Sequence, residues 1–395
     1  MKIDLRSRKK WAYPLNFVTF NLSRLSPFRN KKIWVFGAWE GKKYDDNSKY
    51  LFEYVNGHYR NKIRTIWLSD SLDAVNAVKS NGGETYLNNS FKGKWYQLRA
   101  GVVYYTNALT DFGTFPLVGG AVVATSWHGM SFKKIYNSKY HGFSLFLKKT
   151  LDHVFSWTYR NLSFVPSEQG KKWFKESFTL NSDKIFITGQ PRNDVLKRDI
   201  REKIFKALGI DLDKKLILYL PTYRQLSLGE EAMLTIVKQL YDDKVLDEVL
   251  TETNSVFLVK PHPLTPPIKL DRRENFMVMD YLSVENNQEL LAAGDMLVTD
   301  YSGGFIDFAL LKRPIIFYEP DEEVFLKYSE DMDVKFFELS NLNKAKTPEE
   351  LAERISKPTL KVCYATNKIW EDESIKGTCY SENVYKVICK EIGLN

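Results

Sequence analysis

Short apolar runs alternate with amphipathic stretches along most of this chain. The runs are mostly continuous, which is typical of parallel strands that are covered by helices on both faces. Between them, residues 47–59 and 74–80 have helical spacing of their apolar positions. The predicted strands are residues 33–36, 65–68, 102–105, 121–124, 185–188, 216–220, 256–259, 276–279, 296–299 and 314–318. This alternation predicts an α/β fold with doubly wound parallel sheets.

A break in the strand series suggests two domains. The 395 residues exceed what one ordinary core holds, and a charged helical stretch at 194–215 separates two groups of strands. We therefore expect an N-terminal segment (1–30), a first Rossmann-like domain (31–195) and a second one (196–395). Two such domains facing each other enclose a central cleft between the carboxyl ends of their sheets.

Composition narrows the function classes only in part. The net charge of +8 suits nucleic acid, an anionic membrane surface or a phosphate-bearing substrate. No stretch approaches the roughly 20 apolar residues that span a bilayer. The cysteines lack the spacing of a zinc site and predict free thiols in a reducing cytoplasm; they are Cys363, Cys379 and Cys389.

Two segments have the character of membrane-surface contacts. Residues 1–30 are strongly basic with interleaved aromatic side chains, including Lys9, Lys10 and Trp11. Residues 132–157 place apolar side chains on one helical face, Phe143, Leu147, Leu151 and Val154, with basic residues on or beside it, Lys133, Lys134, Lys148 and Lys149. The alternatives are a solvated arm that packs its aromatics on the body, and a helix face that joins the domain core.

Five loops directly follow predicted strands and carry chemically active side chains. In an open α/β sheet such loops converge on the ligand crevice. His128 follows the run 121–124, and as a neutral imidazole with an ordinary pKa of about 6.5 it is a candidate general base. The other candidates are Arg192, Thr222, Arg224, Lys260, His262, Thr299, Asp300, Ser302, Gly303, Gly304 and Asp307.

The C-terminal loops favour binding of a phosphate-bearing donor. Small residues before a helix start allow close backbone approach to phosphate, and Ser302 adds a hydroxyl. Asp307, one turn later, can bind a ribose hydroxyl, while arginines grip phosphate with two donors. Pro261 and Pro263 hold His262 in one direction beside Lys260. The alternatives are an ordinary capped turn, a strand terminator and surface arginines.

No metal site is predicted. The acidic run at 211–213 has the character of a solvated turn, and the chain has no GxxxxGK[ST] loop, nucleophile elbow or HExxH motif. His58, His141 and His153 lie in helical patterns and are expected to be structural or exposed.

Taken in order, these motifs resemble one known family. "WHG", "GQPRND", "PTYR", "KPHP" and "TDYSG" are similar to motifs of the CDP-glycerol glycerophosphotransferase family of teichoic acid synthesis. The opening "WVFGAWEGKKYDDNSKYLFEYV" and the closing residues 372–388 also resemble it, so that the likeness runs from about Lys32 to Tyr385. Two features depart from the family's pattern. Residues 130–132 replace its usual Thr-Pro-Leu, and no Pro-Gly-Pro element follows the strand at 314–318.

The resemblance implies a two-domain GT-B-like enzyme that is a peripheral protein of the cytoplasmic face of the membrane. It implies transfer of polyol phosphate from a CDP-polyol to an undecaprenyl-diphosphate-linked saccharide, with release of CMP. His128 would then be the base, His262 a donor-phosphate ligand, and Arg224 and the Ser302 loop contacts of the CDP. We expect no cofactor, no metal and no nucleic acid partner.

Other functions stay open at this stage. The polyol can be glycerol or ribitol, in wall teichoic acid or in capsule. A nucleotide-sugar glycosyltransferase shares the fold and the Ser-Gly-Gly loop, but does not call for the WHG and KPHP pair. A nucleic-acid-binding module fits the charge, but the chain carries no recognition motif.

Overall fold

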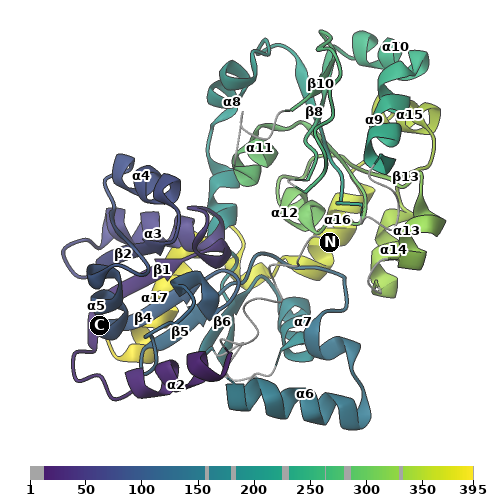
Figure 1. Cartoon of the computed structure of the whole chain (residues 1–395). Helices are drawn as coiled ribbons and strands as arrows, with labels where there is room; N and C mark the ends of the chain where they lie inside the picture. Colours follow the sequence, from purple (N-terminus) through teal and green to yellow (C-terminus); the bar gives the residue numbers. More distant parts are fainter. Residues whose placement is uncertain are drawn as a thin grey trace. The chain divides into compact units, whose positions relative to one another are not determined.

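The chain forms two compact units, each built on one parallel sheet (Figure 1). The structure is a computed structural model and describes residues 13–155, 160–178, 184–224, 231–262, 264–279, 286–328 and 332–394. The first unit comprises Met1–Gly129, Ile135–Asp194 and Asp372–Asn395, and the second comprises Met130–Lys134 and Val195–Glu371.

The first unit contains a seven-stranded sheet of order β3-β2-β1-β4-β5-β6-β7. All its strand pairs are parallel. The strand order reverses between β1 and β4, and this topological switch point is where open α/β sheets bind ligands. Its strands are β1 (Asn30–Gly37), β2 (Arg64–Ser69), β3 (Glu84–Leu87), β4 (Ala100–Tyr105), β5 (Val122–Thr125), β6 (Leu162–Val165) and β7 (Ile185–Ile187). Its α-helices are α2 (Tyr13–Ser23), α3 (Asp46–His58), α4 (Leu72–Ser80), α5 (Phe91–Arg99), α6 (Gly142–Phe155), α7 (Glu168–Ser177) and α17 (Tyr380–Ile392).

Both faces of this sheet are buried, which explains the continuous apolar runs. Trp34 and Phe36 of β1 pack in one core with residues of α3 and α17. The alternate residues Ile33 and Val35 pack in a second core that includes Phe20 of α2. Side chains on successive strand positions point to opposite faces, so both sets must be apolar.

The C-terminal segment returns to the first unit. Val384 and Ile388 of α17 are fully buried in the same core as Trp34, and the Tyr385 ring stacks on Tyr59 with ring centres 3.8 Å apart. Burying side chains of this size contributes about 1.5–3 kcal/mol each. The sequence had placed all of 196–395 in the second domain, whereas residues 372–395 pack with the first unit.

The second unit contains a six-stranded parallel sheet of order β10-β9-β8-β11-β12-β13. Its strands are β8 (Lys215–Leu220), β9 (Ser255–Val259), β10 (Phe276–Val278), β11 (Met296–Thr299), β12 (Ile315–Tyr318) and β13 (Lys344–Ala345). Its α-helices are α8 (Arg201–Leu208), α9 (Ala232–Asp242), α10 (Lys244–Glu252), α11 (Asn287–Ala293), α12 (Gly304–Ala309), α13 (Glu322–Tyr328), α14 (Val334–Ser340), α15 (Pro348–Ser356) and α16 (Lys361–Trp370). Phe132 of the short segment 130–134 stacks on Phe305 of α12.

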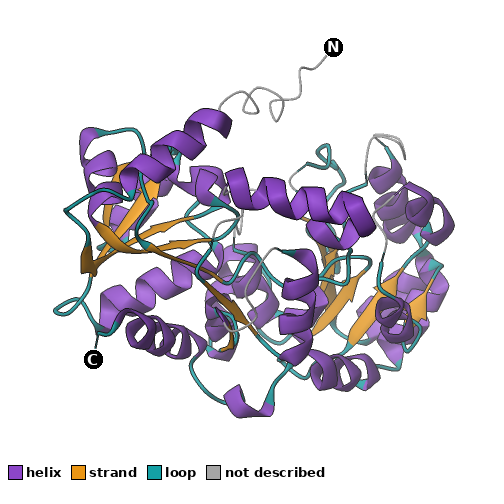
Figure 2. Ribbon diagram, turned by 90° about the horizontal axis from the view of Figure 1, so that it is seen from below, coloured by secondary structure: helices purple, strands orange, loops and turns teal. Residues whose placement is uncertain are grey.

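The structure confirms the predicted fold class of two parallel α/β sheets with helices (Figure 2). All ten predicted strands are present. Their ends are shifted by one residue at most, except that β1 begins three residues and β4 two residues earlier than predicted. Strands β3, β6 and β13 were not predicted. Polar residues interrupt β3 (ETYL) and β6 (LSFV), and β13 has only two residues.

Three further facts bear on the predictions. Cys363, Cys379 and Cys389 are free thiols. In the described ranges, no helix combines the length and the apolar character that a membrane crossing requires. Nor do the described residues contain a group of three or more His, Cys, Asp or Glu side chains placed to hold a metal ion.

Candidate functional site

His128 stands at the carboxyl end of β5, one strand from the switch point. The turn before it is fixed by two bonds: the Trp127 N–H donates to Thr125 Oγ1 over 2.8 Å, and Gln190 Nε2 donates to the Ser126 carbonyl over 3.2 Å. The half-buried His128 ring lies 3.6 Å from the Trp127 ring, centre to centre. The imidazole is therefore held by its neighbours at a strand end.

Arg192 connects the His128 loop to the start of α3. Its Nη1 donates to the His128 carbonyl over 2.8 Å and to Asp46 Oδ1 over 3.2 Å. Its backbone N–H donates to Asn47 Oδ1, and Asn47 Nδ2 donates to the Trp127 carbonyl over 2.8 Å. The sequence assigned Arg192 to donor binding, but its guanidinium fixes the backbone that carries His128.

Gly129 explains why a glycine follows the histidine. Its φ is +114°, which side chains rarely allow, and an added Cβ would lie 2.1 Å from Arg192 Nη2. The guanidinium thus occupies the space that any other residue at position 129 would fill.

The electrostatics around His128 differ from the sequence expectation. We expected an ordinary pKa near 6.5, but burial, with a smaller contribution from the Arg192 charge, lowers the pKa of His128 to about 3. Burial raises the pKa of Asp46 to about 6, although Arg192 opposes that shift. The His128 imidazole is therefore neutral throughout the physiological pH range.

The sequence prediction missed Trp39, beside His128, and Asp111, which binds the loop that carries Trp39. The Trp39 ring stacks on the His128 ring with centres 5.7 Å apart and planes inclined by 30°. Fully buried Asp111 accepts three backbone N–H bonds, from Glu40 at 2.7 Å and from residues 106 and 107 at 2.9 Å each. Burial raises the pKa of Asp111 to about 7 despite these bonds. Trp39 lies in the loop after β1, so the expectation that functional side chains follow strand ends could have identified it. Asp111 has no such signal in the sequence.

In the second unit, Asp300 and Arg224 form a buried network at the ends of β8 and β11. Asp300 Oδ1 accepts from the Thr222 N–H at 2.8 Å and from the Thr222 hydroxyl at 2.6 Å. Arg224 pairs with Asp300 at 2.7 Å and grips Asp321 through Nε and Nη2 at 2.7 and 2.9 Å. Burial acts to lower the pKa of Arg224, but the two carboxylates outweigh it and the net shift is upward.

This network changes the role expected for Arg224. The Arg224 side chain is only 1% exposed, and four hydrogen bonds engage its guanidinium. It therefore fixes the loops after β8 and β11, rather than facing solvent as a phosphate ligand would.

The KPHP loop follows β9 in the same unit. The Leu264 N–H donates to His262 Nδ1 over 3.2 Å, so a neutral His262 carries its proton on Nε2. Lys260 is buried, and its backbone N–H bonds to the Tyr219 carbonyl. Pro263 lies outside the described residues.

The Ser302 loop joins β11 to α12. Ser302 Oγ accepts from the Gly304 N–H at 3.3 Å, and a Cβ on Gly303 would lie 2.5 Å from the Met130 carbonyl oxygen. Asp307, predicted to bind ribose, accepts from Gln288 Nε2 at 3.1 Å and is buried. Thr299 donates to a backbone carbonyl of β8.

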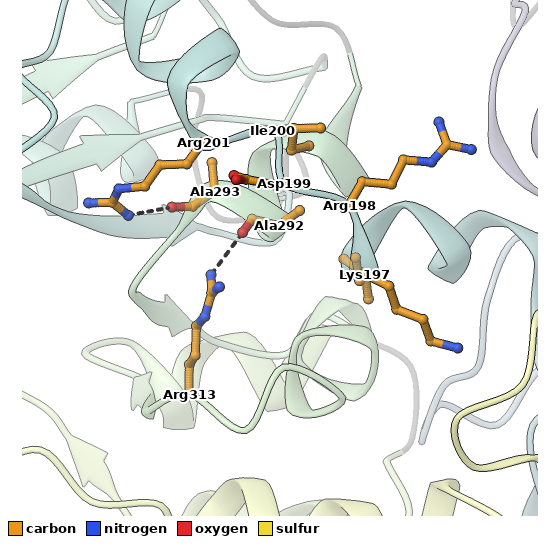
Figure 3. A pocket seen from close by; sticks show the side chains of 9 residues that line it. Lys197, Arg198, Asp199, Ile200, Arg201, Ala292, Ala293 and Arg313 are labelled. Carbon is orange, nitrogen blue, oxygen red and sulfur yellow. Dashed lines mark hydrogen bonds between the residues drawn. The ribbon is translucent and has the colours of Figure 1, made fainter.

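A pocket of about 320 Å³ lies elsewhere in the second unit, and no predicted site residue lines it. Arg201 and Arg313 donate there to the carbonyls of Ala293 and Ala292, at the end of α11 (Figure 3). Lys197 and Arg198 point away from these two arginines (Figure 3). The two bound arginines thus cap a helix end, and the basic groups do not converge on one point.

The membrane-contact candidates are separated by the structure. Lys9, Lys10 and Trp11 lie outside the described residues, as do the side chains of Leu151 and Val154. Lys133 and Lys134 belong to the second unit, whereas Lys148 and Lys149 lie on α6 of the first unit. On α6, Phe143 and Phe146 are 79% and 66% exposed. Helix α2 contacts α6 and exposes apolar side chains of its own, Leu15, Val18 and Leu22.

Comparison with known proteins agrees with the sequence motifs. The sequence profile of the family described as CDP-Glycerol:Poly(glycerophosphate) glycerophosphotransferase matches residues 18–369. The chain belongs to this family of enzymes. The match includes both histidine motifs and all the loops described above.

Individual relatives cover nearly the same length. A teichoic acid poly(glycerol phosphate) polymerase of Bacillus spizizenii is 29% identical over 384 residues, 92% of each chain. A teichoic acid glycerol-phosphate transferase of Staphylococcus aureus is 31% identical over 335 residues, 80% of each chain. The fold matches a solved structure of the wall teichoic acid polymerase TagF with a TM-score of 0.75, covering 99% of both chains at 23% identity.

Proposed function

We propose that this glycerophosphotransferase transfers glycerol phosphate from CDP-glycerol to a hydroxyl group of a lipid-linked acceptor and releases CMP. The observation that carries the proposal is the His128 imidazole, which is held neutral at a strand end in a chain that matches the family over residues 18–369. The relatives named above are a glycerol-phosphate transferase and a poly(glycerol phosphate) polymerase.

In the proposed reaction, the acceptor oxygen attacks the β-phosphorus of CDP-glycerol. One P–O bond forms to the acceptor, and the P–O bond to CMP breaks. His128 takes the proton from the attacking hydroxyl. The low pKa of His128 in the protein without substrate makes this side chain a weak base. The negative charge of a bound diphosphate would raise that pKa.

The leaving CMP carries growing negative charge, which the second unit can stabilise. Lys260 supplies a positive charge, and the Nε2–H of His262 and the Ser302 hydroxyl supply hydrogen-bond donors. Arg224 acts indirectly, by holding the loops that carry Thr222 and Asp300. We propose that these groups stabilise the leaving CMP without a metal ion. Loss of turnover after dialysis against EDTA, restored by a divalent cation, would contradict catalysis without a metal ion.

Membrane contact is proposed through α2 and α6. Their exposed apolar side chains lie beside Lys148 and Lys149, a combination that binds anionic lipid at the interface. Phe143→Ser combined with Phe146→Ser should reduce pelleting with anionic liposomes at low salt. Equal pelleting of the double variant and the unchanged protein would contradict this surface.

The reaction is tested by CMP release from CDP-glycerol, CDP-ribitol and a UDP-sugar, with and without a lipid-linked disaccharide. We expect acceptor-dependent CMP from CDP-glycerol. A preference for CDP-ribitol would change the polyol, and UDP release alone would contradict the proposed chemistry.

The same assay tests the base. His128→Ala should lower turnover by about 10²–10⁴-fold and leave the Kd for CDP-glycerol unchanged. His58→Ala, at an exposed position on α3, serves as the matched control. Retention of more than a tenth of normal turnover in His128→Ala would contradict the role of His128 as the base.

A further inference from the structure

The loop after β1 has an unusual backbone that neither the proposed reaction nor the motifs explain. Trp39, Glu40 and Gly41 follow one another with φ values of +51°, +56° and +74°. Left-handed conformations are uncommon for bulky residues, and two in succession store strain. Such strain persists only where the surroundings enforce it, and it is frequent at ligand sites.

The enforcing contacts come from two neighbouring loops of the first unit, the one after β2 and the one that carries Asp111. Asp111 accepts the Glu40 N–H at 2.7 Å. The Gly41 carbonyl accepts from the Asp70 N–H at 2.7 Å and from the Ser69 hydroxyl. The strained turn is thus bound at Glu40 and at Gly41, directly after Trp39, and these contacts fix its geometry before any substrate arrives.

This geometry places the Trp39 indole beside the proposed base. Its ring stacks on His128 at 5.7 Å, and its Nε1 is buried with no hydrogen-bond partner among the residues that the structure describes. A buried indole N–H ordinarily has a hydrogen-bond partner, because leaving it unpaired costs free energy. Lys43 Nζ lies 6.0 Å from the centre of the same ring.

We propose that Trp39 forms a subsite for the acceptor, holding the polyol or sugar whose hydroxyl attacks phosphorus. The apolar ring face suits the C–H face of a sugar or glycerol unit, and the Nε1–H suits one of its hydroxyl oxygens. Lys43 suits an acceptor that carries phosphate. The inference rests on the proposed function, since it takes His128 as the base and places the donor ligands in the second unit.

Substitutions of Trp39 distinguish an acceptor subsite from a purely structural role, because the two roles predict different kinetic effects. Trp39→Leu removes the aromatic face and the N–H, and Trp39→Phe removes only the N–H. We expect Trp39→Leu to raise the KM for the acceptor about tenfold or more, with a smaller rise in Trp39→Phe. The KM for CDP-glycerol and the thermal midpoint should stay within error. Trp95→Leu, on a half-buried tryptophan that contacts Phe28, is the matched control.

A binding readout keeps the test independent of turnover. A water-soluble analogue of the lipid-linked disaccharide should change the tryptophan fluorescence of the unchanged protein, and Trp39→Phe should abolish that change. If the unchanged protein releases no acceptor-dependent CMP, the proposed function fails, but a fluorescence change that depends on Trp39 still supports the subsite. An unaltered acceptor KM in Trp39→Leu, an equal fall in both substrate affinities, or a fluorescence change retained in Trp39→Phe would each overturn it.

Discussion

Single residues around His128 determine its protonation state and its direction. Arg192 contributes a charge that lowers the His128 pKa and a hydrogen bond to the His128 carbonyl. Gly129 leaves the space in which that guanidinium lies. The three residues therefore act as one arrangement, and each can be tested by a single substitution.

Gly129→Ala should disrupt this arrangement. The new Cβ meets Arg192 at 2.1 Å, and the backbone keeps a φ that alanine disfavours. We expect a loss of about 1–3 kcal/mol in the free energy of unfolding, measured by chemical denaturation. A shift of the imidazole should also lower kcat/KM by about 10²-fold. Normal activity and stability would show that Arg192 can move aside freely.

The pH dependence of activity should reflect the low pKa of His128. Between its ordinary pKa of 6.5 and the native value of about 3, the unfolded chain binds more protons than the native state, so this histidine makes stability fall as the pH falls. For the same reason, the pH profile of kcat/KM should show no acid limb from protonation of His128 between roughly pH 5 and pH 8.

Arg192 variants test the electrostatic contribution to that shift, which is smaller than the contribution of burial. Arg192→Gln removes the charge and should move the acid limb of kcat/KM upward, whereas Arg192→Lys keeps the charge and should leave the limb low. An acid limb of kcat/KM near pH 6.5 in the unchanged enzyme, unaffected by either variant, would contradict His128 as a base with a lowered pKa.

At the scale of elements, the GQPRND loop connects the sheet to the final helix. Helix α17 begins without a side-chain cap from the residue that precedes it, Cys379. Asp194 supplies the cap from a distance in sequence, accepting the N–H groups of Tyr380 and Ser381 at 2.8 Å each. A carboxylate at a helix N-terminus also interacts favourably with the helix dipole. One loop thus serves both the His128 turn and α17.

Asp194→Ala should leave two N–H groups of α17 without their partner. We expect a loss of about 0.5–2 kcal/mol in the free energy of unfolding, as for other removed caps. Thermal denaturation of this variant and of Asp199→Ala, at an exposed neighbouring position, gives the comparison. Equal midpoints for the two variants would show that α17 does not depend on this cap.

At the scale of the whole molecule, the chain passes from the first unit to the second and then returns. Residues 372–395 complete the core of the first unit, although they follow the whole second unit in sequence. The stability of the first unit therefore depends on the segment that returns to it.

Ile388→Ala should show this dependence. The side chain is fully buried in the core that includes Trp34, and truncation of such residues costs about 2–5 kcal/mol. Hydrogen exchange should reveal faster opening of β1 and β4, with little change in β8 and β11. Lys390→Ala, on an exposed position of α17, is the control. Loosening of the second sheet instead would contradict this division.

The sequence by itself determined the α/β class, ten of the strands and the loops that carry the reactive side chains. It could do so because burial on both faces requires continuous apolar runs, and because parallel strands end at one edge of a sheet. The strands β3, β6 and β13 were missed, since polar residues interrupt the first two and the third has only two residues, so that none shows a continuous apolar run.

Only the tertiary structure decided which partner each loop residue has. Arg192 contacts the His128 backbone, Arg224 is enclosed by two aspartates, and Asp307 bonds to Gln288. It also revealed the strained turn at Trp39 and the Asp111 carboxylate that holds it. Backbone dihedrals, through-space contacts and burial depend on residues far apart in the chain, so no local pattern specifies them.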